Sequence, residues 1–110
     1  NMITEIQANY IGCEERSFKS KEGEDVHYRK LNFLCHGEQT PFAMSVRSDC
    51  ELLNISQFEK IVLMIDWAFN QKSGFWNPKV IQVLTGKERE AYIKRSDIGN
   101  PAVGKVVSNG

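Results

Sequence analysis

Two apolar runs separated by a short polar loop occupy residues 58–84, and they constrain the fold of this chain more than any other feature. The runs are Phe58–Phe69 and Phe75–Leu84, and Asn70–Gly74 lies between them. Gly74 can adopt the positive φ that a tight reversal needs. The segment therefore predicts a β-hairpin. Because side chains alternate along a strand, one face of its first strand is apolar throughout and contains Ile61, Leu63, Ile65, Trp67 and Phe69.

Large aromatic side chains gather near the predicted turn of this hairpin. They are Trp67, Phe69, Phe75 and Trp76, with Lys72 and Lys79 close by in the sequence. Aromatic rings beside cations at a strand end suit the stacking of unpaired bases. Such rings also cap the end of a hydrophobic core, and both interpretations stay open for each ring.

Three further strands are predicted before the hairpin, over residues 2–18, 25–36 and 39–47. Gly12 predicts a bulge or bend within the first, and Gly23 a left-handed turn position before the second. In the second strand we expect Leu31, Phe33 and Cys35 to face inward. In the third, Phe42, Met44 and Val46 are expected to share one face. Residues 48–57 break the β pattern. There we expect a short helical turn begun by Ser48 or Asp49, with Cys50, Leu52 and Leu53 beneath the sheet.

This layout predicts an all-β fold, a five-stranded OB-fold-like barrel over residues 1–84. A brief helical or irregular element between the third and fourth strands is typical of it. An SH3-like barrel or a half-open β-sandwich would give a similar pattern. Residues 85–110 predict a C-terminal extension, with one or two helical turns over Lys87–Arg95 and a flexible tail over Ile98–Gly110.

The charge balance argues against a strongly basic nucleic-acid binder. The 110 residues have a formal net charge of zero, with nine Lys or Arg against eleven Asp or Glu up to Leu84 and five against three after it. Nucleic-acid binders usually have a basic domain or face. Any such binding must therefore use a local patch.

The cysteine and hydropathy patterns predict a cytoplasmic protein. Cys13, Cys35 and Cys50 are odd in number and lack close paired spacing, which indicates free thiols in a reducing compartment. No apolar run approaches the length of a membrane span, so we expect no membrane partner.

Catalytic and metal-binding motifs are missing from the sequence. There is no phosphate loop or nucleophile elbow. The ligand types His27, Cys35 and His36 lack the paired spacing of zinc sites. We therefore predict a protein that is not an enzyme and has no metal, no cofactor and no small-molecule substrate.

Cations and aromatic rings are interleaved on three segments that an OB-like barrel would bring to one rim. The candidate nucleic-acid-binding residues are Arg16, Phe18, Lys19, Lys21, Tyr28, Lys30, Lys72, Phe75, Trp76 and Lys79. Rings would stack on bases and cations would neutralise phosphates. The alternative is a set of solvated hairpin tips, since Asp or Glu lies in or beside each segment.

The run Arg16–Tyr28 resembles the first hairpin of single-stranded-DNA-binding proteins of the filamentous-phage gene V type. It contains a serine- and lysine-containing segment, an acidic turn with Gly23 and an aromatic residue on the returning strand. The body up to Leu84 is similar to that family in length and strand order, but it is neutral and is followed by an added tail. The resemblance implies a small OB-fold that binds single strands cooperatively, commonly as a two-fold dimer. It also implies that Arg16, Phe18, Lys19, Lys21 and Tyr28 are contact residues.

We therefore expect sequence-tolerant binding of single-stranded DNA, with RNA as the alternative ligand, in phage or mobile-element replication. A homodimer agrees with exposed apolar residues on the Val62–Met64 face and with an unpaired edge strand. The alternative function is a protein-interaction module that uses the same aromatic rim for a replication or phage partner, and the neutral charge favours it.

Overall fold

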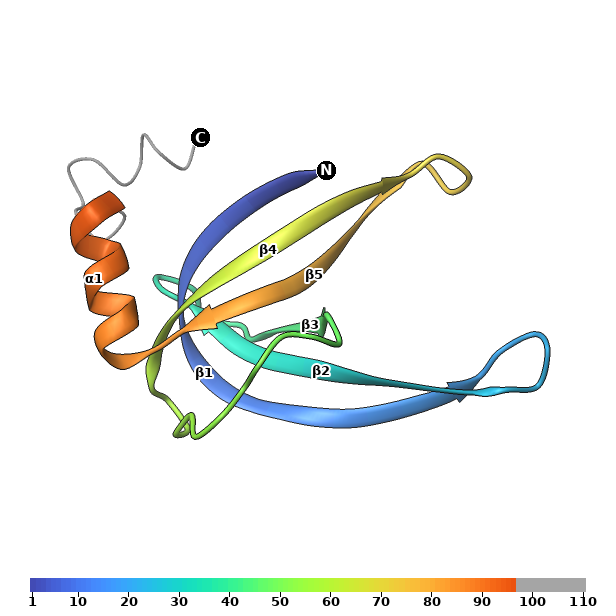
Figure 1. The fold of residues 1–110 in the computed structure, drawn as a ribbon, viewed down its shortest axis with the longest axis horizontal. Helices are drawn as coiled ribbons and strands as arrows, with labels where there is room; N and C mark the ends of the chain where they lie inside the picture. The colour runs from blue at the N-terminus through green and yellow to red at the C-terminus, as the bar shows by residue number, and fades with distance from the viewer. Residues whose placement is uncertain (97–110) are drawn as a thin grey trace.

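The computed structural model describes residues 1–96, which form a closed barrel of five β-strands followed by one helix (Figure 1). The elements are β1 (Met2–Lys19), β2 (Asp25–Cys35), β3 (Phe42–Val46), β4 (Lys60–Asn70), β5 (Phe75–Leu84) and α1 (Gly86–Ser96). The order around the barrel is β1-β2-β3-β5-β4. The prediction of an all-β, five-stranded OB-like barrel is confirmed. The tail predicted over Ile98–Gly110 lies outside the described residues.

Strand β1 pairs with two different neighbours along its length. Residues 2–9 pair with β4, and residues 8–19 pair with β2. The register with β2 shifts between Tyr10 and Gly12, which confirms the bulge predicted at Gly12. Before the bulge Ala8 and Tyr10 face inward, whereas after it Cys13 lies opposite the buried Leu31. The bulge therefore changes which residues of β1 face the core.

The core lies inside the barrel, and all five strands contribute to it. Its buried members are Ala8, Leu31, Phe33, Val46, Cys50, Ile61, Leu63, Ile65 and Val80. The alternation predicted for β2 and for the start of β4 is therefore confirmed. Burial of large apolar side chains stabilises a fold by about 1.5–3 kcal/mol each, so these residues hold the barrel together.

The barrel is closed by a short parallel contact between β3 and β5. Val46 lies opposite Val80, and the Arg47 N–H donates to the Val80 carbonyl at 2.8 Å. The Arg29 guanidinium then donates from Nη2 to the Arg47 and Ser48 carbonyls at 2.8 and 3.2 Å. This side chain fixes the chain where it leaves β3.

Several predicted boundaries differ from the structure for identifiable backbone reasons. Strand β3 begins at Phe42 because Pro41 has no N–H to donate to a ladder. Strand β4 begins at Lys60, since Phe58 has a φ of 70°, which no extended strand allows.

Residues 48–57 form no helical turn, so the irregular alternative of the element predicted between the third and fourth strands is confirmed. Cys50 is buried and Leu52 packs on the core, as predicted. Leu53, however, is 70% exposed. Without helical geometry, neighbouring side chains such as those of Leu52 and Leu53 have no common face toward the sheet.

Helix α1 packs on the outside of the barrel, against β1 and β4 (Figure 1). It is longer than the one or two turns predicted for Lys87–Arg95. The Tyr92 hydroxyl donates to the Glu5 carboxylate, and burial together with this partner raises the pKa of Tyr92 to about 12. Val62, on the outer face of β4, is fully buried. The expected exposed Val62–Met64 face is therefore wrong, because sequence alternation did not foresee a helix contacting that side of β4.

The difference between Leu63 and Leu53 gives a matched stability test. Leu63→Ala should lower the free energy of unfolding by about 2–5 kcal/mol, because it leaves a cavity in the core. Leu53→Ala should change it by less than about 0.5 kcal/mol, since the side chain is in solvent. Urea unfolding followed by circular dichroism measures both, and equal effects would contradict this description of the core.

Candidate nucleic-acid interface

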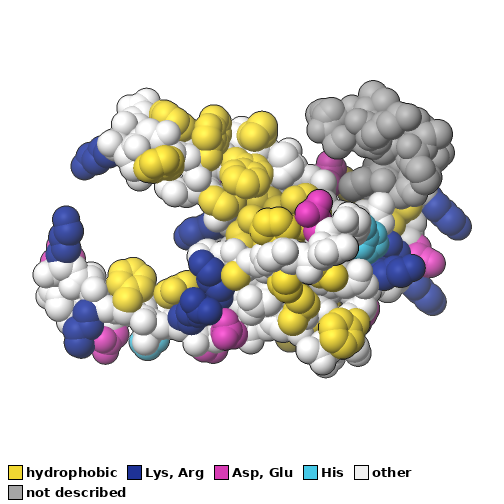
Figure 2. Space-filling model, turned by 180° about the vertical axis from the view of Figure 1, so that it is seen from behind, with side chains coloured by type: hydrophobic (Ala, Val, Ile, Leu, Met, Phe, Trp, Pro, Cys, Tyr) yellow, Lys and Arg dark blue, Asp and Glu magenta, His cyan; other side chains and the backbone are white. Residues whose placement is uncertain are grey.

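Two β-hairpins extend beyond the barrel on the same side of the molecule (Figure 1). We call the β1–β2 hairpin beyond Arg29 the first arm, because β3 pairs with β2 only from Arg29 onward. We call the β4–β5 hairpin beyond Trp67 the second arm, because β1 pairs with β4 only as far as that residue. Figure 2 shows an open gap between the arms, hydrophobic side chains over the second arm and the base of the gap, and Lys or Arg side chains near both ends.

One face of the first arm, continued to Lys30 at its base, brings together two aromatic rings and two cations. Arg16 lies opposite Tyr28, Phe18 opposite Val26, and Lys30 opposite Glu14. All of these lie on the face away from the core residue Leu31, because the bulge at Gly12 sets their alternation. The Phe18 and Tyr28 rings meet edge to face with their centroids 6.0 Å apart. Phe18 is 54% exposed, so its ring is open to a ligand.

Carboxylates neutralise part of the positive charge on the first arm. Arg16 donates from Nη2 to the Glu14 carboxylate at 2.8 Å, and the Lys19 ammonium lies 2.9 Å from Asp25. The hydrogen bond from Arg16, aided by a second from Asn32, lowers the pKa of Glu14 below its ordinary range. Exposed pairs of this kind contribute little to stability, because water screens them. A phosphate could therefore displace either carboxylate at little cost.

The turn of the first arm presents a further cation. The Gly23 φ of 84° confirms its predicted left-handed conformation, and the Gly23 N–H donates to the Ser20 carbonyl at 2.9 Å. Lys21 is exposed in this turn and has no ion pair within residues 1–96.

The second arm has aromatic rings on both of its faces. Phe69 and Trp76 lie opposite each other on the core-side face, with ring centroids 5.3 Å apart, and each ring is about half exposed. Phe75, which is 70% exposed, shares the other face with Lys79. In the turn, the Asn70 side-chain oxygen accepts from the Lys72 and Ser73 N–H groups at 2.9 and 3.2 Å, which orders the backbone that presents Lys72.

Trp67 belongs to the core and not to the exposed tip. Its ring packs on the buried cluster, and its Nε1–H donates to the Thr4 hydroxyl at 2.8 Å. The sequence left open whether each aromatic ring caps the core or is exposed for a ligand, and both cases occur on β4. Trp67 caps the core, whereas Phe69, two residues further on, is exposed.

The structure places the ten predicted site residues in the two arms and the strand segments leading into them, without giving them one common face. The first arm groups Arg16, Phe18 and Tyr28, with Lys30 on the same face at its base. The second places Trp76 on one face and Phe75 on the other, with Lys79 on the face of Phe75 at the base. Lys19 is on the core-side face of the first arm, paired with Asp25. The list of ten omitted two exposed neighbours, Val26 and Phe69. Val26 lies opposite Phe18, and Phe69 lies opposite Trp76. These pairs follow from the cross-strand register, which can be predicted from sequence only when the length of the turn is known.

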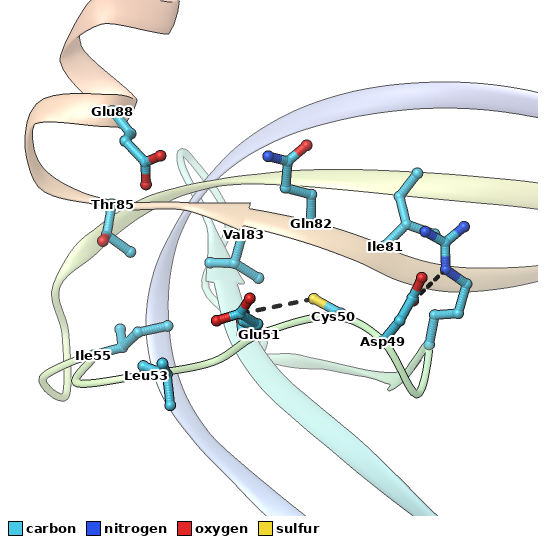
Figure 3. A pocket seen from close by; sticks show the side chains of 11 residues that line it. Asp49, Cys50, Glu51, Leu53, Ile55, Ile81, Gln82, Val83, Thr85 and Glu88 are labelled. Atoms are coloured by element: carbon cyan, nitrogen blue, oxygen red, sulfur yellow. Dashed lines mark hydrogen bonds and ion pairs between the residues drawn. The ribbon is translucent and has the colours of Figure 1, made fainter.

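A pocket of about 560 Å³ lies away from the arms, between β5 and the irregular segment after β3 (Figure 3). Asp49, Glu51 and Glu88 line it together with the Cys50 thiol. Burial raises the pKa of Cys50, so this thiol stays protonated at neutral pH and is a poor nucleophile. Within residues 1–96 no three His, Cys, Asp or Glu side chains gather as a metal site would require. The three cysteines are free thiols.

The fold and the arms define a closed OB-like β-barrel with two exposed aromatic hairpins. Comparison with protein-family models, with curated proteins and with solved structures found no match for this chain. In the described part of the chain, no helix is long and apolar enough to cross a bilayer.

The ion pair on the first arm can be tested by titration. Because the hydrogen bond from Arg16 lowers the pKa of Glu14, Arg16→Gln should raise that pKa toward the ordinary glutamate value. Because the pKa of the Glu14 carboxyl is lower in the folded protein than in the unfolded chain, the pair stabilises the fold at pH values above the unfolded-chain pKa. This stabilisation is lost as the pH falls through the pKa of the folded protein. Carboxyl-detected NMR between pH 2 and 7 measures the shift. An unchanged Glu14 titration would contradict the pairing, and Lys21→Gln is the matched control.

Proposed function

We propose that this protein binds single-stranded DNA without sequence preference and without catalysis, through the two arms, during phage or mobile-element DNA replication. The observation that supports this most is the exposure of aromatic rings on both arms. Phe18, Phe75 and Trp76 are each about half or more exposed, although burial is the ordinary place for such side chains. Stacking of a base on an aromatic ring contributes about 1–3 kcal/mol and tolerates any base, which suits a sequence-independent ligand.

The cations of the arms would supply phosphate contacts next to these rings. Lys21, Lys30 and Lys72 have no ion pair within the described residues, and Arg16 is held beside Tyr28 by its cross-strand position. The binding energy must come mainly from stacking and from these local contacts, since the formal net charge of the chain is zero. We therefore expect a shallower salt dependence than a strongly basic binder shows.

Trp76→Ala provides the direct test. Loss of one stacking ring should weaken binding of a fluorescein-labelled oligo-dT by about 5- to 150-fold, as measured by fluorescence anisotropy at 20 mM salt. The fold should persist, because Trp76 is half exposed. Phe58→Ala is the control, since Phe58 is an exposed ring preceding β4 at the end opposite the second arm.

Two results would contradict the proposal. One is no binding of oligo-dT by the unmodified protein at 20 mM salt, where phosphate contacts are strongest. The other is equal weakening by Trp76→Ala and Phe58→Ala. A parallel titration with oligo-rU decides between DNA and RNA.

A protein-interaction module is the second candidate function, and the neutralised cations of the first arm favour it. With Arg16 and Lys19 paired to carboxylates, the exposed rings of the arms resemble a hot-spot patch for a replication or phage partner. A second copy of this chain is one such partner, as the proposed homodimer requires. Light scattering coupled to size exclusion separates these cases. The second function would be favoured if the protein is a monomer, does not bind oligo-dT, and binds a partner protein in a way that Trp76→Ala abolishes.

A further inference from the structure

A second group of cations lines a pocket beside α1, at the end of the barrel opposite the arms. The pocket has a volume of about 420 Å³ and is formed by residues of β1, the turn after β2, β4 and α1, namely Gln7, His36, Lys60, Arg89, Glu90, Ile93 and Lys94. Figure 2 shows Lys and Arg side chains beside a histidine at this end of the molecule. None of these residues belongs to the interface described above.

The pocket has an excess of positive charge that the chain as a whole does not have. Lys60, Arg89 and Lys94 face it together with His36, and Glu90 is the acidic residue among the seven that line it. The formal net charge of the protein is zero, so this excess is local. A concave surface lined by one sign of charge concentrates ions of the other sign.

The Arg89 guanidinium is held in a fixed orientation at the pocket. Its Nη2 donates to the Gln7 side-chain oxygen at 3.0 Å. Its Nε is buried and has no hydrogen-bond partner among the described residues. A buried N–H without an acceptor is costly and uncommon in folded proteins. An acceptor that reaches this edge of the guanidinium would satisfy it, and the planar guanidinium matches the geometry of an oxyanion.

His36 reports the same positive field. The backbone N–H of His36 donates to the Gln7 carbonyl at 3.1 Å, which fixes this residue at the pocket wall. Burial lowers the pKa of His36, and the charges of Arg89 and Lys60 lower it further. The protonated form of His36 is therefore disfavoured beside Arg89 and Lys60.

We propose that this pocket is an oxyanion site that binds a phosphate group, with Arg89 as the oriented donor and Lys60 and Lys94 as flanking charges. The phosphate can belong to the backbone of a nucleic-acid strand or to a small phosphate compound. The proposal stands on the pocket alone and does not require that the arms bind DNA.

The experiment is an NMR titration of the full chain with inorganic phosphate at pH 7, against sodium chloride of equal ionic strength. Phosphate should shift the Arg89 Nε–H and His36 ring signals saturably. It should also raise the pKa of His36, which lines the pocket together with the charged residues Lys60, Arg89, Glu90 and Lys94. Lys94→Gln should weaken phosphate binding about three- to tenfold. Arg95→Gln is the matched control, because it removes the same charge from the same helix outside the pocket.

The outcomes distinguish specific phosphate binding at this pocket from non-specific screening of charge by salt. Shifts that do not saturate, that chloride reproduces, or that Lys94→Gln and Arg95→Gln alter equally would overturn the proposal. Oligo-dT is then added in place of phosphate. The same saturable shifts identify a nucleic-acid backbone as the source, whereas shifts with phosphate alone identify a small phosphate compound. Failure of oligo-dT to contact the arms would end the proposed function and leave this site unaffected.

Discussion

The change of partner along β1 is the constraint on which the rest of the structure depends. The first part of this strand pairs with β4 and the second part with β2, and the bulge at Gly12 lies just beyond the change of partner. A single continuous strand thus connects both hairpins of the barrel. Because its alternation changes at the bulge, the buried Ala8 and the exposed Cys13 both lie on the core side of β1, while Arg16 and Phe18 lie on the other side. The position of one glycine therefore decides which side chains of the first arm meet Tyr28.

The two ends of the barrel are built for different surroundings. At one end the two hairpins extend beyond the barrel, where no third strand pairs with them. Rings such as that of Phe75 therefore remain in solvent. At the other end α1 covers β4 and buries Val62, while Arg89 and Tyr92 bond to polar side chains of β1. The proposed interface and the proposed oxyanion site thus lie on opposite sides of one shared core.

Local rules predicted much of this fold. Alternation identified Leu31, Phe33, Ile61 and Leu63 as core residues, and the glycine positions identified the turns at Gly23 and Gly74. Contacts between distant segments could not be predicted in this way. The burial of Val62 depends on a helix more than twenty residues later, and Trp67 and Phe69 differ only in how far β1 extends beside them. Among the candidate site residues, sequence supplied the residue types, but the cross-strand register determined their faces.

The pairing of cations with carboxylates on the first arm affects kinetics as well as affinity. Because Arg16 and Lys19 each have an acidic neighbour within 3 Å, their fields cancel at distances beyond a few ångströms. Long-range steering, which accelerates the association of strongly charged proteins, is then weak here. A ligand of the arms would arrive by unguided diffusion, and its residence time, set by short-range ring contacts, would determine how long the arms stay occupied.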